Sequence, residues 1–176
     1  MATNDLTRKQ AETRKQQISN VKYHVNLSLN KTDLDYKAKT TIYFDFNDMG
    51  QDSLMIDFIT KEIALLSVNG KEVSDYNKDD YWLYIPSSLL MSGLNEITIH
   101  YTNTYNNTGS GFHRFVDSED SEVYIHSDFE PYDAHRLFPC FDQPDLKATY
   151  KLTVKGPKEW AFIHNTNADQ ESVEGD

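Results

Sequence analysis

The residues best able to do chemistry are crowded into the stretch from His126 to Tyr150. It holds three of the five prolines, the only cysteine and a dense run of acidic and aromatic side chains. Within it, Glu130 precedes Pro131, and a proline pushes the residue before it towards an extended conformation. Pro131 has no N–H to donate to a sheet, so we expect the chain to leave any sheet there. A carboxylate at such a break is a candidate binding site, because binding groups concentrate on loops that a rigid scaffold positions.

The rest of this stretch is expected to form short local structure. Residues Asp133 to Leu137 predict about one helical turn with the aspartate near its start, and Pro139 ends that turn. The tetrapeptide D-Q-P-D at 142–145 is typical of a turn. We expect the charged side chains of the segment to form local ion pairs and caps. These side chains belong to Asp133, Arg136, Asp142 and Asp145.

Three other patterns suggest chemistry less strongly. Cys140 lies between Pro139 and Phe141 and is expected to be a buried small hydrophobe, since a catalytic thiol needs a base and an electropositive setting. His126-Ser127-Asp128 has the composition of a catalytic triad, but triad members meet from distant positions and alternate strand residues point to opposite faces. The acidic segment 117–122 lacks the glycine and spacing of an EF-hand, so we interpret it as a solvated hairpin tip.

The histidines lack the spacing of a catalytic zinc site. Such a site commonly uses two histidines four residues apart on a helix, a carboxylate ligand and a glutamate as general base. The six histidines are His24, His100, His113, His126, His135 and His164. No two of them are four apart and none is followed by Glu, so the chain contains no H-E-x-x-H motif.

The elements that must position these residues are predominantly strands. Residues 21–29 and 36–46 alternate between apolar and polar side chains, which predicts two half-buried strands. Asn69-Gly70 is a strong hairpin signal, because both residues tolerate positive φ. Short strands with turn signals at fairly regular spacing indicate an all-β sandwich or open barrel. The other expected strands are 54–59, 63–68, 71–73, 81–85, 94–101, 112–116, 123–129, 148–154 and 160–164.

A short helix is predicted near the start, over residues 5–18, with Asn4 or Thr3 as its cap. It is rich in Lys, Arg, Gln and Glu and has almost no apolar stripe, so we expect it to lie exposed. Its only expected packing residues are Leu6, Ala11 and Ile18.

The whole chain, residues 1–176, is expected to be a single domain with a helical segment over 1–19 and a loose tail over 165–176. A domain of this size can bury a substantial core. The 12% aromatic content tilts the expectation towards β structure. Residues 75–80 are expected to form a polar turn. Residues 102–111 are expected to form a polar loop, the best candidate for mobility.

Net charge and cysteine content limit which binding partners and which cellular compartment we expect. A formal net charge of −11 repels a phosphate backbone, so we expect no nucleic-acid partner. No run approaches the ~20 apolar residues of a membrane span, and no basic start precedes an apolar core. We therefore expect neither a membrane partner nor a signal peptide. Cys140, the only cysteine, excludes an intramolecular disulfide, which favours a reducing, cytoplasmic location.

One long motif resembles a known family. The sequence S-D-F-E-P-Y-D-A-H-R-L-F-P-C-F-D-Q-P-D-L-K-A-T-Y, residues 127–150, closely resembles a signature in the amino-terminal domain of the aminopeptidase N family, zinc exopeptidases of the gluzincin type. The flanking G-F-H-R-F-V-D is similar to the family, and L-T-R-K-Q-A-E-T-R resembles its bacterial branch. The resemblance covers nearly the whole chain. It implies a twisted, antiparallel, saddle-like all-β domain with a short N-terminal helix.

The resemblance also implies what the chain lacks. The family's H-E-x-x-H helix and G-x-M-E-N substrate loop are absent. We therefore expect a fragment that is inactive alone and holds no metal or cofactor, while zinc is bound by the missing catalytic domain. The complete enzyme would remove N-terminal amino acids from peptides. The expected partners are a peptide substrate with a free N-terminus and the enzyme's own catalytic domain.

Two residues acquire expected roles from the resemblance. Glu130 falls where this family's amino-terminal domain supplies a Glu or Gln to the substrate amine. Asp128 falls where relatives often carry Gln, facing the first side-chain pocket; an aspartate there departs from the pattern. The resemblance further suggests a cis bond between Glu130 and Pro131. The alternative is a stand-alone β-sandwich module that binds carbohydrate or protein through exposed Tyr and Trp side chains.

Overall fold

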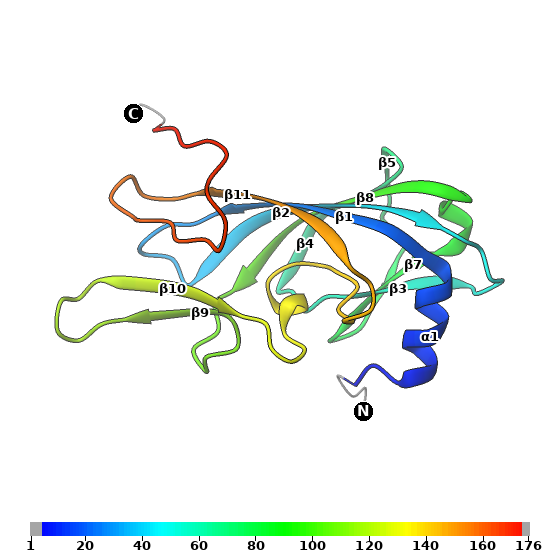
Figure 1. Ribbon diagram of the computed structural model, residues 1–176, viewed down its shortest axis with the longest axis horizontal. Coiled ribbons are helices and arrows are strands. Elements are labelled where there is room, and N and C mark those ends of the chain that lie inside the picture. Colours follow the sequence, from blue (N-terminus) through cyan, green and yellow to red (C-terminus); the bar gives the residue numbers. More distant parts are fainter. Residues whose placement is uncertain (1–4, 174–176) are drawn as a thin grey trace.

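The computed structural model describes residues 5–173, and within this range the chain folds into two layers of strands preceded by one helix (Figure 1). The mostly β architecture with a short N-terminal helix is confirmed. In chain order the elements are α1 (Arg8–Gln17), β1 (Ile18–Ser28), β2 (Asp35–Phe46), β3 (Ser53–Asp57), β4 (Glu62–Val68), β5 (Lys71–Glu72), β6 (Asn77–Lys78), β7 (Trp82–Pro86), the 3-10 turn η1 (Ser87–Leu89), β8 (Gly93–Thr104), β9 (Gly111–Val116), β10 (Val123–Asp128), the 3-10 turn η2 (Ala134–Arg136) and β11 (Ala148–Lys155).

One layer is a six-stranded sheet with the order β11-β1-β2-β8-β4-β5. Its neighbours run antiparallel with one exception, because β1 and β11 pair in parallel, from Val21 opposite Ala148 to Ser28 opposite Lys155. The expected antiparallel architecture is therefore confirmed, with one parallel pair at an edge of the large sheet. Parallel strands need a long crossover connection, and here all the elements from β2 to η2 lie between the two strands.

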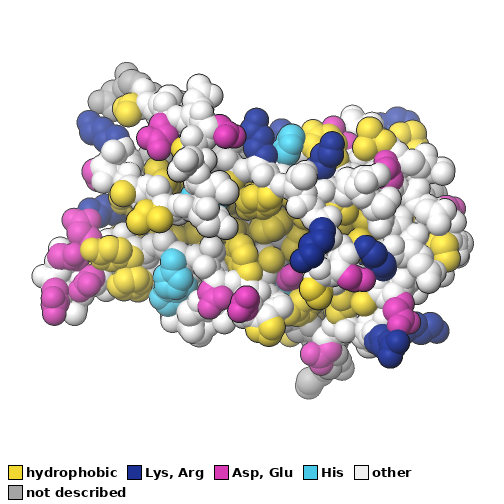
Figure 2. Space-filling model, viewed as in Figure 1, with side chains coloured by type: hydrophobic (Ala, Val, Ile, Leu, Met, Phe, Trp, Pro, Cys, Tyr) yellow, Lys and Arg dark blue, Asp and Glu magenta, His cyan; other side chains and the backbone are white. Residues whose placement is uncertain are grey.

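The second layer lies beneath the large sheet and has three parts (Figure 1). The sheet β3-β7-β6 lies towards one end and the β9–β10 hairpin towards the other. The long segment between β10 and β11 fills the space between them. Acidic side chains gather at the free end of the hairpin, and hydrophobic side chains show in the middle of the same face (Figure 2).

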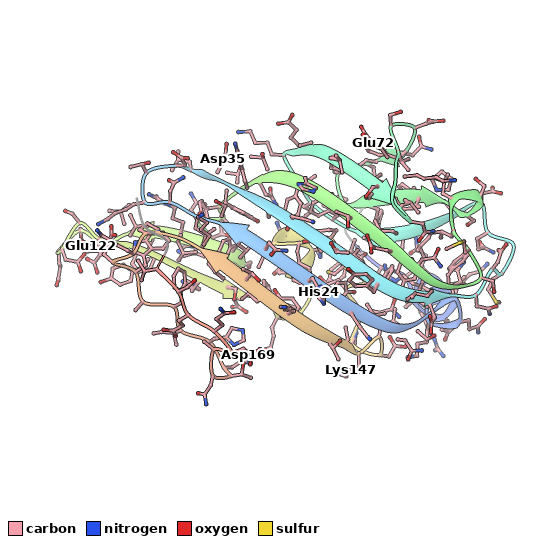
Figure 3. The ribbon with its side chains drawn as sticks, turned by 90° about the horizontal axis from the view of Figure 1, so that it is seen from above. His24, Asp35, Glu72, Glu122, Lys147 and Asp169 are labelled. Atoms are coloured by element: carbon pink, nitrogen blue, oxygen red, sulfur yellow. The ribbon has the colours of Figure 1, made fainter. Side chains whose placement is uncertain are left out.

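The core follows from the alternation of the long strands. Side chains at every second position of a strand share one face, and on the large sheet the inward face is apolar. Val25, Ile42 and Phe44 have no exposed surface. Figure 3 looks down on the opposite face of this sheet, where His24 lies. The predicted burial of the even positions of β2 and the odd positions of β1 is therefore confirmed.

The predicted hairpin at Asn69-Gly70 is confirmed, with φ of 51° and 77° at its two residues. Its return strand β5 is shorter than the expected 71–73. The expected polar turn at 75–80 is wrong in part, because Asn77 and Lys78 form β6 and pair with β7. An edge strand needs only backbone pairing, so such a short one leaves no apolar pattern to read.

Helix α1 begins later than the sequence suggested. Thr7, rather than Asn4 or Thr3, is the N-cap: its Oγ1 accepts a hydrogen bond from the N–H of Gln10 at 3.3 Å, and the Gln10 side chain accepts the Thr7 N–H at 2.9 Å. This reciprocal capping box satisfies two backbone donors of the first turn. The two earlier residues lie outside the described range.

The expectation that this helix is exposed is wrong for one side of it. Arg14 is 2% exposed and Gln17 is 5% exposed, although neither is apolar. Arg14 is buried because its Nη1 lies 2.5 Å from Oδ2 of Asp57, a fully buried carboxylate in β3. A charged contact of this kind leaves no trace in a hydrophobic periodicity, so the sequence pattern could not reveal which face packs inward.

The segment after β11 also differs from expectation. No strand forms at 160–164 in the described chain; Trp160 closes a turn through its N–H to the carbonyl of Pro157 at 3.1 Å. Ile163 is 95% exposed, so the segment lacks the burial that would hold it against β11. Residues 165–173 are exposed throughout, in line with the loose tail. At the expected 102–111 loop, β8 instead continues to Thr104.

Candidate functional site

The segment from Phe129 to Lys147, here called the signature loop, joins the end of β10 to the start of β11. The peptide bond between Glu130 and Pro131 is cis, as the resemblance suggested. The predicted helical turn is confirmed as η2, Ala134–Arg136. The turn predicted at 142–145 forms one residue later, where the Leu146 N–H donates to the carbonyl of Gln143 at 3.2 Å.

Buried side chains of the large sheet hold the middle of the signature loop. The Tyr101 hydroxyl donates to the carbonyl of Leu137 at 2.9 Å, and the Tyr36 hydroxyl donates to the same oxygen at 3.2 Å. Asn103 Nδ2 donates to the carbonyl of Arg136 at 2.8 Å. These bonds satisfy loop carbonyls that no strand partner reaches. Burial raises the pKa of both tyrosines, so the two hydroxyls remain neutral donors.

The loop also fixes itself through local charges, as predicted. Asp133 pairs with Arg136. Asp142 Oδ2 lies 2.7 Å from Nδ1 of the fully buried His135 and also accepts the N–H of that residue. Asp145 accepts a hydrogen bond from the Gln143 side chain at 2.8 Å. The irregular backbone is therefore held in one conformation from several directions.

Glu130 and Asp128 lie at the start of this loop with exposed side chains. Asp128 Oδ1 accepts the N–H of Glu130 at 3.2 Å, so the two residues are directly linked. Among residues 5–173, no salt bridge joins either carboxylate to a cationic side chain. Their charge is therefore available to an external cation.

The two carboxylates lie outside two hollows in the surface of the described chain. One hollow of about 230 Å³ lies between α1 and β3, and another of about 340 Å³ lies beside the β1–β2 turn. Neither is lined by Glu130 or Asp128.

The remaining candidates of the sequence do not form a catalytic group. Burial, followed by the Asp142 and Asp57 carboxylates, raises the pKa of Cys140 well above its ordinary value, which confirms a buried, unreactive thiol. The ring of His126 packs against that of His113 across the hairpin, with centroids 4.7 Å apart and the planes tilted by 41°. In the described part of the chain, no group of three or more His, Cys, Asp or Glu side chains could hold a metal ion. No described helix is long and apolar enough to cross a membrane.

Sequence reasoning missed Asp57. It alternates with the buried Leu54, Ile56 and Phe58, so the strand pattern would place it on a polar outer face. Yet it is 0% exposed and bonded to the signature loop. No single-sequence signal marks it, because its partners come from segments far away in the chain.

Comparisons with known proteins agree with this architecture. The model of the peptidase M1 N-terminal domain family matches residues 19–176. An aminopeptidase N of Streptomyces lividans is 34% identical over 169 residues, which cover 94% of this chain and 19% of that protein. A human glutamyl aminopeptidase is 34% identical over 107 residues, 57% of this chain and 11% of that protein.

A solved structure, the native yeast LTA4 hydrolase, has the same fold, with a TM-score of 0.68 at 17% identity over 81% of this chain and 23% of that one. The chain spans 19% of the length of the Streptomyces aminopeptidase N and 11% of that of the human glutamyl aminopeptidase. The family model covers the large sheet, both smaller sheets and the complete signature loop. The chain therefore belongs to the peptidase M1 N-terminal domain family.

Proposed function

We propose that residues 1–176 form the amino-terminal β domain of a longer zinc aminopeptidase that removes N-terminal amino acids from peptides. In this proposal Glu130 binds the free α-ammonium group of the substrate. The observation that carries it is an exposed carboxylate with no cationic partner in the described chain, set at the start of an irregular loop that buried groups hold in place.

A carboxylate in this position can do two things for an exopeptidase. It can accept charge-assisted hydrogen bonds from an ammonium group, worth about 1.5–3 kcal/mol net. It can also act as a ruler, because a peptide that extends past it would lose this contact and meet the loop. Fixed geometry favours both effects, since binding groups that are already ordered lose little entropy on binding.

Asp128 is a second proposed contact, near the first side chain of the substrate. Its support is the hydrogen bond that the Glu130 N–H donates to Asp128 Oδ1, which links the Asp128 carboxylate to the backbone of Glu130. That bond engages Oδ1 and leaves Oδ2 for a ligand. Asp128 therefore helps to orient Glu130 as well.

Zinc belongs, in this proposal, to the catalytic domain of the longer protein. The described residues do not fit a zinc site, so this chain would contribute binding and orientation rather than metal chemistry. A cytoplasmic location is also proposed, and its support is the buried free thiol of Cys140. The stand-alone binding module is not favoured, because the family match extends over nearly the whole chain.

The test is Glu130→Ala in the full-length protein. We expect kcat/KM for peptides with a free amino terminus to fall by about tenfold to a hundredfold, which corresponds to ~1.4 kcal/mol per decade. Glu119→Ala is the matched control, because Glu119 is an equally charged, exposed residue at the hairpin tip. An unchanged kcat/KM in the Glu130 variant would remove that residue from the substrate site.

A further inference from the structure

One buried carboxylate accepts hydrogen bonds from four residues in three parts of the chain: helix α1, strand β7 and the signature loop. Oδ1 of Asp57 accepts bonds from Trp82 Nε1 at 2.9 Å and from the Tyr132 hydroxyl at 2.6 Å. Oδ2 accepts bonds from Arg14 Nη1 at 2.5 Å and from the backbone N–H of Asp142 at 2.8 Å. The carboxylate has no exposed surface. Each oxygen thus has two donors, which is the complete satisfaction that a buried charge requires.

The backbone of Asp57 is bound to the signature loop too. Its N–H donates to the carbonyl of Cys140 at 2.9 Å, and the N–H of Cys140 donates back at 3.1 Å. Asp57 therefore contacts the loop at Tyr132, at Cys140 and at Asp142. No regular sheet joins these three points, so a single residue of β3 links the two ends of the loop.

The charge of Asp57 is matched from the N-terminal helix. Arg14, itself 2% exposed, pairs with it and uses its Nε to donate to Gln143 Oε1 at 2.5 Å. Gln143 in turn donates to the carbonyl of Ala11 at 3.1 Å. Because the cation and the anion cancel, this cluster adds no net charge beside the exposed carboxylate of Glu130.

The bond to Tyr132 is the contact nearest to Glu130. Within the described chain, Glu130 itself has only its N–H bonded, to the exposed Asp128. The next hydrogen bond to a buried group is the one that the Tyr132 hydroxyl, two residues later, donates to Asp57 Oδ1. On the other side, Phe129 packs its ring against Phe138, with centroids 6.2 Å apart. An apolar contact and one buried hydrogen bond therefore bracket the Glu130-Pro131 pair.

We propose that Asp57 is a positioning residue for the substrate site, acting on Glu130 through the hydroxyl of Tyr132. The inference rests on the proposed function, because it assigns Asp57 and Tyr132 a role in holding the carboxylate that receives the substrate amine. Misplacement of a binding group by about 1 Å can cost up to a hundredfold in rate. The hydrogen bond between Tyr132 and Asp57, here called the clamp, can therefore change the rate without touching the substrate.

The experiment removes only the Tyr132 hydroxyl, with Tyr132→Phe in the full-length protein. Substitution of the buried Asp57 itself would destabilise the fold and obscure the result. Tyr84→Phe is the matched control: its half-buried hydroxyl also donates to an aspartate, Asp79 Oδ2 at 2.9 Å, but it does not contact the loop. The first readout is hydrogen exchange, followed by mass spectrometry, over peptides that cover residues 126–134. We expect severalfold faster exchange there for Tyr132→Phe and unchanged exchange for Tyr84→Phe. Unchanged exchange in both variants would overturn the clamp.

The second readout is a double-mutant cycle on kcat/KM for free-amine peptides. Tyr132→Phe is expected to lower kcat/KM by about threefold to thirtyfold, and to have almost no further effect once Glu130→Ala is present. An equal effect in both backgrounds would show that Tyr132 does not act through Glu130. If Glu130→Ala has no effect while exchange still accelerates in Tyr132→Phe, the clamp exists but the proposed function is wrong.

Discussion

The β9–β10 hairpin and the signature loop share one layer but are stabilised in opposite ways. The hairpin is regular, with six paired positions from Val123 opposite Val116 to Asp128 opposite Gly111, yet most of its side chains are exposed or half-buried. The signature loop has almost no regular pairing, yet Leu137, Phe138 and its neighbours up to Phe141 are buried.

The difference shows that backbone regularity and fixed position are separate properties. Exposed backbone hydrogen bonds and few buried contacts permit local opening at low free energy, whereas buried contacts raise that free energy. The hairpin depends on its own cross-strand pairs, such as Phe115 stacked on Tyr124 with centroids 5.1 Å apart. The loop depends on side chains of four distant strands, β1, β2, β3 and β8. Glu130 stands where one region passes into the other.

The largest expected effect separates the two regions by the loss of one aspartate from each. Asp57→Ala is expected to lower the free energy of unfolding by about 3–5 kcal/mol, because it leaves Arg14 buried without its partner. Asp120→Ala, at the exposed hairpin tip, is expected to cost far less, because an exposed charge contributes little to stability. Urea unfolding followed by circular dichroism measures both. Equal losses would mean that the loop is held no more firmly than the hairpin.

A smaller effect comes from deletion of one hydroxyl in each region. Tyr101→Phe removes a buried bond to the Leu137 carbonyl and is expected to cost about 1–1.5 kcal/mol. Tyr124→Phe removes an exposed hydrogen bond to Asp120, 2.9 Å long, and is expected to change stability much less. The same denaturation measurement applies. A larger loss in the hairpin variant would reverse the comparison.

The smallest expected effect is a change in the slope of stability with pH. Burial raises the pKa of Tyr101 in the folded chain above the ordinary value near 10, so its contribution is complete below about pH 10 and is lost as the pH rises further. Tyr101→Phe should therefore flatten the decline of stability between about pH 10 and 11, by up to ~1.4 kcal/mol per pH unit. Urea denaturation at stepped alkaline pH, with wild type and Tyr101→Phe side by side, measures this slope. Parallel declines for wild type and Tyr101→Phe would exclude this linkage.

The sequence predicted the parts of the fold that depend on short local patterns. The apolar faces of β1 and β2, the Asn69-Gly70 hairpin and the η2 turn all follow from local patterns. The pairing of β11 with β1 did not, because it joins residues that are more than a hundred positions apart and strand alternation does not specify direction.

The candidate site was predicted less completely. The position of Glu130 beside a proline break was visible in the sequence, because proline chemistry is local. Its support was not, since the ties to Asp57, Tyr101 and Asn103 arise only in the folded chain. The buried ion pair could not be predicted from the sequence, because Arg14 and Asp57 are charged and the patterns of their segments indicate surface positions.

Helix α1 lies outside the residues that the family model matches, and this has a practical consequence for where the chain can be shortened. The match starts at residue 19, one position after β1 begins, and so leaves out the helix that carries Arg14. A protein trimmed at that boundary would keep every strand and lose the only counter-ion that Asp57 has among residues 5–173. The N-terminal boundary of this folding unit is therefore set by the need of the buried Asp57 carboxylate for the Arg14 cation. It lies at or before Thr7, the N-cap of α1.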